Sequence, residues 1–186
     1  TLNYPQGTEM IIKDSVFYLA TSQGFAVSKD EGYSWEFYNE GFPGYHSIRC
    51  IAISDQFIYT GFTSGLYRSS IDTIEWFEIF DANIRNLKAR DSSIIVSLGS
   101  GDEGLFRSGD YGMTFHAVSL PEIGVPDPNV FLDETYEKVF ALDNEPYYSE
   151  DWGITWSYYP FENLLLNLYC ITESEGVTLV SGGQIV

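Results

Sequence analysis

The sequence predicts an all-β protein made of similar four-stranded antiparallel units, and three observations support this prediction. Aromatic residues make up 17% of the chain, with 14 Tyr, 13 Phe and 4 Trp, and such side chains favour strands. Short segments of alternating apolar and polar residues follow one another, with turn residues between them and no helical pattern. A turn-like motif recurs about every 40 residues, which predicts one β-rich unit per repeat.

The motif combines Ser, Asp, Gly, a second hydroxyl residue and an aromatic residue. It is complete in residues 28–35, 108–115 and 149–156, which we call the box turns. A fourth copy, residues 69–76, keeps the Ser and the Trp but lacks Gly and has its acid at Asp72. The first residues of the four copies are 41, 39 and 41 residues apart. The defining residues are Ser28, Asp30, Gly32 and Trp35, then Ser108, Asp110, Gly112 and Phe115, then Ser149, Asp151, Gly153 and Trp156.

The box turns resemble the Asp-box, or BNR repeat, of sialidase-like and related β-propellers, with Phe115 in place of Trp as the one departure. The resemblance implies a β-propeller in which the box is a folding device. The residue chemistry agrees, because an Asp side chain can accept hydrogen bonds from nearby backbone amides and Gly can take a positive φ. We therefore expect the three aspartates to be structural residues and not catalysts.

Four strands with the box between the third and the fourth make one propeller blade. A single 40-residue period along the chain predicts one domain, residues 1–186. The blades are expected at about residues 10–38, 47–80, 84–118 and 129–159, with a fifth made of residues 165–186 plus 1–5. The expected strands are 10–13, 16–21, 25–28 and 34–38; 47–54, 57–62, 65–69 and 75–80; 84–89, 93–98, 105–108 and 114–118; and 130–133, 138–142, 147–149 and 155–159.

The fifth blade is expected to borrow a strand from the other end of the chain. Residues 166–172, 177–181 and 184–186 supply three strands, and residues 1–5 resemble the fourth strand of the preceding blade. Pairing of the N-terminal strand with the last blade closes the ring and removes the exposed sheet edges that favour aggregation. The sequence thus predicts five blades closed by the N-terminal strand, and the alternative is an excerpt from a propeller of six or more blades.

The charge and the cysteines exclude several functional classes. The chain has 9 basic and 27 acidic residues, a net charge of −18, so a nucleic-acid partner is not expected. The charge of this acidic protein indicates either a solvated, self-repelling surface or, alternatively, a basic partner or bound cations. No apolar run approaches membrane-spanning length, so membrane insertion is not expected. Cys50 and Cys170 occupy matching places in their repeats and are expected as buried thiols, and no motif predicts a metal or a cofactor.

The candidate binding residues lie in the parts of the chain that depart from the repeat. In a propeller the loops between blades lie on the face opposite the boxes, which we call the loop face, and there loops vary more freely than strands. The aromatic residues could anchor a protein or stack on a sugar, and packing between blades is the alternative. The two acids could hold a cation, although a solvated turn is favoured. These candidates are Phe42, Tyr45, His46, Phe161, Asp102 and Glu103.

A sialidase-like enzyme is the activity that the resemblance first suggests, and it requires a cluster of arginines. The chain has five arginines, of which Arg49 matches Arg85 and Arg68 matches Arg107 in repeat register, a pattern typical of blade architecture. We therefore predict no enzyme but a binding or assembly module that binds a protein partner through its loop face. The alternatives are a glycan-binding, lectin-like module and, less favoured, a glycoside hydrolase. A secreted, cell-surface or virion protein is favoured, and the oligomeric state is left open.

Overall fold

A computed structural model describes residues 6–44, 47–99, 104–121, 131–135, 138–142, 146–158, 167–174 and 177–183. All the regular elements in these ranges are β-strands, numbered β1 to β18. Within the same ranges, no helix is long and apolar enough to cross a membrane. The predicted strands at residues 1–5 and 184–186 lie outside the described residues, and so does their pairing.

The strands form five antiparallel sheets, which we call blades one to five. Blade one contains β1 (Gly7–Lys13), β2 (Val16–Thr21), β3 (Gly24–Ser28) and β4 (Glu36–Phe37). Blade two contains β5 (Cys50–Ile53), β6 (Phe57–Phe62), β7 (Gly65–Ser70) and β8 (Phe77–Phe80). Blade three contains β9 (Ile84–Arg90), β10 (Ser93–Leu98), β11 (Leu105–Ser108) and β12 (His116–Val118). Blade four contains β13 (Phe131–Thr135), β14 (Lys138–Leu142), β15 (Pro146–Ser149) and β16 (Ser157–Tyr158), and blade five contains β17 (Asn167–Ser174) and β18 (Val177–Gly183).

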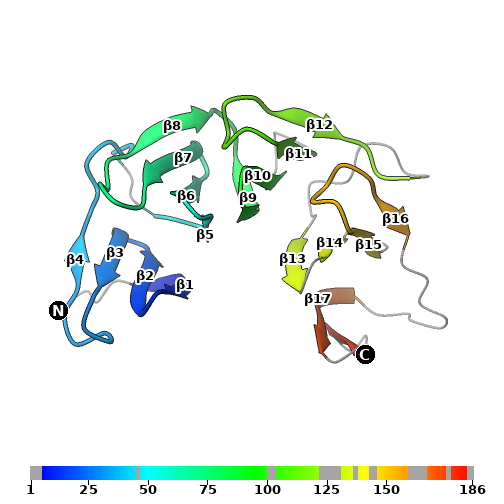
Figure 1. Ribbon diagram of the computed structural model, residues 1–186, viewed down its shortest axis with the longest axis horizontal. Coiled ribbons are helices and arrows are strands. Elements are labelled where there is room, and N and C mark those ends of the chain that lie inside the picture. The colour runs from blue at the N-terminus through cyan, green and yellow to red at the C-terminus, as the bar shows by residue number, and fades with distance from the viewer. Residues whose placement is uncertain are drawn as a thin grey trace.

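The five blades follow one another along an arc (Figure 1). In each four-stranded blade, neighbouring strands are consecutive in sequence, so the chain passes outward from the first strand to the fourth. The first strands β1, β5, β9, β13 and β17 line the inner side of the arc, and each contacts the next. Among the described residues the ring is not closed, because β1 and β17 lie at the two ends of the arc (Figure 1).

The fourth strand of each four-stranded blade is shorter than the sequence predicted. For example, β4 begins at Glu36, whereas the expected strand began at residue 34. The reason is that Ser34 belongs to the turn, where its amide and its hydroxyl both donate hydrogen bonds to Asp30. By contrast, β1 is longer than expected. It begins at Gly7, three residues before the expected start, because Gly7 pairs with Thr21 past a bulge.

The core lies between the blades, because each sheet has two apolar faces. Ile51 and Tyr67 pack with blade one, whereas Cys50 and Leu66 belong to a second cluster shared with blade three. A third cluster joins blades three and four. Cys50 is buried as predicted, and its burial raises the pKa of its thiol. The blades approach closely at Gly61, where an added Cβ would lie 2.6 Å from both Cys50 Sγ and Ile84 Cγ2.

On one face of blade one, two large apolar side chains of β1 are exposed. Met10 is 51% exposed and Ile12 is 57% exposed, both on the face that points away from blade two. The residues that match Met10 in blades two and three are Ile51 and Leu87, and these are buried at 1% and 0% exposure by the preceding blade. This face of blade one therefore has the composition of an interblade surface without its neighbour.

Candidate functional site

The box turns are closed by the carboxylates that the sequence singled out. In the second box turn, Asp110 Oδ1 accepts the Ser108 hydroxyl at 2.7 Å and the Thr114 amide at 2.9 Å. Asp110 Oδ2 accepts the Thr114 hydroxyl at 2.7 Å. The turns around Asp30 and Asp151 repeat this arrangement. The hydrogen bonds expected of the three aspartates within their own turns are therefore present.

Two consecutive residues of each box turn have a positive φ. The glycine at the fifth position has φ values of 90°, 85° and 83° in the three copies, in the region where a Cβ is strained. The residue before it has φ values of 59°, 59° and 54°. These pairs are Glu31 and Gly32, Tyr111 and Gly112, and Trp152 and Gly153.

Hydrogen bonding keeps the box carboxyl groups ionised at low pH. The hydroxyl and the amide of Thr114 lower the pKa of Asp110 to about 2. Bonds from Ser34, and then from Ser28, lower the pKa of Asp30. Partial burial raises the pKa of Asp151, but the bonds from Thr155 outweigh this effect and the net shift is downward. A carboxyl group whose pKa lies well below its usual value is a poor proton donor near neutral pH.

The altered turn at residues 69–76 is held to blade one instead of by a carboxylate. Ile71 stands where the other turns have Asp, and the Ser69 hydroxyl accepts the Glu75 amide at 2.8 Å. Trp76 is 3% exposed, and its Nε1 donates to the Tyr38 carbonyl of blade one at 2.8 Å. In the first and third box turns the tryptophan donates to a glycine carbonyl of its own turn.

Two of the arginines in repeat register join neighbouring blades. Arg68 Nη1 donates to the Tyr111 carbonyl at 2.6 Å, and Arg107 Nε donates to the Trp152 carbonyl at 2.6 Å. Each arginine precedes the first Ser of its own turn, and each acceptor is the positive-φ residue before glycine in the next blade. We call these two contacts the arginine latches. The sequence revealed the register of the arginines but not their acceptors, since these lie 43 and 45 residues away.

The loop of residues 39–44 is fixed to blades one and two. The Asn39 side chain accepts the Phe25 amide at 3.0 Å and donates to the Gln23 carbonyl at 2.9 Å. The half-buried Phe42 ring stacks on Trp76 with centroids 4.6 Å apart and meets Phe62 edge-on at 4.9 Å. The packing alternative thus accounts for Phe42, and its contact with a partner stays a prediction.

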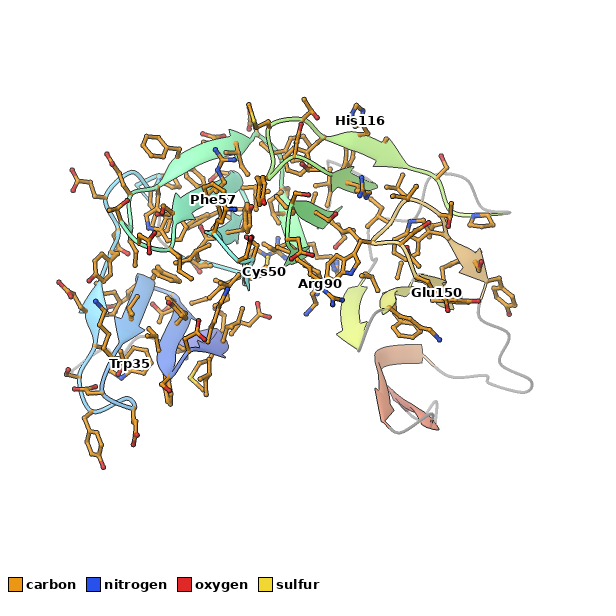
Figure 2. The ribbon with its side chains drawn as sticks, in the orientation of Figure 1. Trp35, Cys50, Phe57, Arg90, His116 and Glu150 are labelled. Carbon is orange, nitrogen blue, oxygen red and sulfur yellow. The ribbon has the colours of Figure 1, made fainter. Side chains whose placement is uncertain are left out.

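The other predicted binding residues are Tyr45, His46, Asp102, Glu103 and Phe161, and they lie outside the described residues. In the loops between blades, which form the loop face, Glu40 and Asp81 are exposed acids of two successive loops. His116 lies on the outer rim of the arc, far from Cys50 and Arg90 on the inner side (Figure 2). Within the described ranges, no three His, Cys, Asp or Glu residues gather as metal ligands would.

No protein-family model matches the sequence, and no curated protein matches it either. Solved structures do match. An ancestral GH74 enzyme aligns with a TM-score of 0.68 at 18% identity, over 85% of this chain and 24% of that one. YCF48 from Cyanidioschyzon merolae aligns with a TM-score of 0.62 at 10% identity, over 92% of this chain and 61% of that one. A chain of the nidogen/laminin complex aligns with a TM-score of 0.64 at 10% identity, over 95% of this chain and 72% of that one.

These similar structures are β-propeller proteins. The chain therefore has a β-propeller fold. Identities of 10% to 18% show the fold alone, and the chain spans only about a quarter of the length of the GH74 enzyme.

The depressed pKa of Asp110 predicts a pH-dependent contribution to stability. The group stabilises the fold above its unfolded pKa, near 3.8, and the contribution is lost as the pH falls through the folded value of about 2. We expect Asp110→Asn to lower the melting temperature at neutral pH, with a difference from the native chain that shrinks between about pH 4 and pH 2. Thr114→Val should reduce the same pH-dependent difference. Thermal unfolding followed by circular dichroism checks this, and a difference that stays constant down to about pH 2 contradicts it.

The ring contacts of Phe42 predict that truncating it destabilises the fold. Phe42→Ala is expected to cost about 2 kcal/mol, below the usual range for a fully buried phenylalanine because this ring is half-buried. The matched control is Phe77→Ala on β8, where the side chain is 60% exposed and a cost of about 0.5 kcal/mol or less is expected. Denaturant unfolding midpoints measure both. Equal midpoints for the two variants would show that the Phe42 ring does not stabilise the packing of the blades.

Proposed function

We propose that this chain is a non-catalytic β-propeller module that binds a protein partner through its loop face. The observation that carries the proposal is that several charged side chains are bonded to the backbone or to side chains of the protein itself. The box carboxylates are bonded within their own turns, and Arg68 and Arg107 donate to the backbone of the next blade. A sialidase-like site would direct a cluster of arginines at its substrate, whereas Arg68 and Arg107 join neighbouring blades here. Folds of this kind host many functions, so the assignment rests on these groups and not on the fold.

The charge of the chain favours a basic partner. The net charge is −18, and the exposed Glu40 and Asp81 place carboxylates in two successive loops of the loop face. Because Asn39 and Phe42 anchor the first of these loops, it loses little conformational entropy when a partner binds. Among the similar structures, YCF48 was solved bound to D1 peptide, and nidogen in a complex with laminin. These two complexes support a protein-binding role for this chain.

We further propose that the ring has five blades and is closed by residues 1–5, paired beside residues 184–186. The exposed apolar face of blade one supports this closure, since blades two and three bury the matching face against a neighbour. A closed ring covers that face and removes the open sheet edges.

Ring closure predicts that Ile12, although 57% exposed among the described residues, is buried in solution. Ile12→Asp should then destabilise the chain by about 2 kcal/mol or more, since it loses apolar burial and buries a carboxyl group. The control is Ile154→Asp, at a side chain that is 65% exposed in the third box turn. If denaturant unfolding finds the two variants equally stable, the face is open and the longer propeller is favoured.

Loop-face binding predicts that panning of phage-displayed random peptides against the chain enriches basic sequences. Their binding should weaken by about tenfold or more in the double variant Glu40→Lys/Asp81→Lys, because like charges then face each other. The control, Asp55→Lys/Glu150→Lys, changes the net charge equally, in the turn between β5 and β6 and in a box turn, on the opposite face. Fluorescence anisotropy of the enriched peptides measures both.

Three results would contradict this assignment. Peptides that bind both double variants equally would move the site off the loop face. Enrichment of glycans on an array, without peptide binding, would favour the lectin-like alternative. Turnover of chromogenic glycosides that survives repurification of the chain would make it a hydrolase.

A further inference from the structure

The interface between blades one and two has no arginine latch. The residue before the first Ser of the turn is Arg68 in blade two and Arg107 in blade three, but it is Val27 in blade one. On the other side of this interface, Asp72 stands where the next two blades present the acceptor carbonyl. At this interface the arginine is therefore replaced, and the residue at the acceptor position lacks the positive φ of Tyr111 and Trp152.

The residues that surround a latch are also replaced here. Arg68 lies over the Phe57 ring at 4.7 Å, and Arg107 Nη2 donates to Ser93 Oγ at 3.2 Å. The matching residue in blade one is Val16, whose side chain gives an arginine neither a ring nor an acceptor. With Val27 in place of the arginine, a pocket of about 310 Å³ is left between blades one and two.

The pocket has apolar and aromatic walls and two charged residues. Its apolar and aromatic lining residues are Val16, Tyr18, Val27, Tyr38, Ile71 and Ile74. Lys29 and Asp72 also line it, and both side chains are exposed. Among the described residues, the carboxylate of Asp72 has no hydrogen-bond or ion-pair partner. The pocket therefore offers one unpaired acceptor for a cation beside two tyrosine rings.

Acids stand beside the two tyrosines that line the pocket. The Tyr38 hydroxyl donates to Glu36 Oε2 at 2.6 Å, which raises the pKa of Tyr38. Burial, and then the charge of Asp14, raise the pKa of Tyr18. Lys29 is the one positive group that lines the pocket, and its long stem lets the ammonium group move into solvent.

We propose that this pocket binds an arginine side chain presented by a peptide segment of a partner protein. At the next two interfaces an arginine of this chain occupies the same position of the repeat, and this is why we choose that side chain. The aliphatic stem would lie along Val16 and Val27, and the guanidinium would stack on a tyrosine ring and donate to Asp72. Arginine suits such a site better than lysine because its planar group stacks on rings and bonds a carboxylate in bidentate fashion.

The pocket is separate from the surface proposed above. It is lined by Lys29 of a box turn and by Asp72 of the altered turn, whereas the loop-face acids Glu40 and Asp81 do not line it. The inference therefore goes beyond loop-face binding. The pocket can bind arginine whether or not the loop face binds a partner.

The test is a nuclear magnetic resonance titration of the full chain with the methyl groups of Ile and Val labelled. The probe is the peptide acetyl-Gly-Ser-Arg-Ser-Gly-amide, and the matched controls replace its arginine with citrulline or lysine. Citrulline keeps the shape of arginine but not its charge. We expect the arginine peptide to shift the methyl signals of Val16, Val27, Ile71 and Ile74, and the citrulline peptide to bind about tenfold or more weakly.

Substitutions on both sides of the pocket test whether the arginine peptide binds there. Val27→Arg should abolish binding, because the arginine of the chain itself then fills the pocket as it does in blades two and three. Asp72→Lys should weaken binding by about tenfold or more, whereas Glu75→Lys, the same charge change in the same turn, should not. Lys29→Gln should tighten binding, since it removes the like charge that lines the pocket.

Several results would overturn the proposal. These are equal binding of the arginine and citrulline peptides, methyl shifts confined to other residues, or full binding by folded Val27→Arg. If Val27→Arg does not fold, the Asp72→Lys and Glu75→Lys pair decides, and equal binding by these two variants rejects the pocket. The Glu40→Lys/Asp81→Lys variant should bind the arginine peptide normally, so a failure at the loop face is told apart from a failure here.

Discussion

Each blade of this protein depends on its neighbours, because a four-stranded sheet with apolar residues on both faces cannot bury them alone. Ile51 and Tyr67 need blade one, and Cys50 and Leu66 need blade three. The demand is strict where side chains pack directly onto a strand, as at Gly61, which has no room for a Cβ beside the side chains of Cys50 and Ile84. It also makes the exposed Met10 and Ile12 of blade one an interblade surface that lacks its neighbour among the described residues.

The box turns connect local folding to this packing. The carboxylate closes the turn, and the turn places a positive-φ residue just before its glycine. The carbonyl of that residue accepts the arginine latch from the preceding blade. One short motif thus shapes a hairpin and supplies an acceptor for the adjacent blade. The acids of the motif and these two arginines are used for folding, and the proposed binding role rests on this observation.

The interface between blades one and two departs from the rest in a coordinated way. Val27, Asp72 and Ile71 replace the arginine, the acceptor residue and the box aspartate together. Trp76 compensates by bonding to Tyr38 across the interface, and Phe42 stacks on Trp76 from the loop side. The blades therefore stay joined by aromatic packing, while the space of the latch remains open as a pocket.

The sequence by itself determined the β-rich repeat, the register of its turns and the order of the sixteen strands in the first four blades, five of them with both bounds correct. These features depend on local properties, namely side-chain alternation, turn residues and a period of about 40 residues. It also predicted the bonding of Asp30, Asp110 and Asp151, because both partners lie within one turn. Only the tertiary structure decided what Arg68, Arg107 and Phe42 contact, and that a pocket separates blades one and two. Those contacts join residues from different repeats, and the distance between two repeats is set by the packing of whole sheets, which no local pattern records.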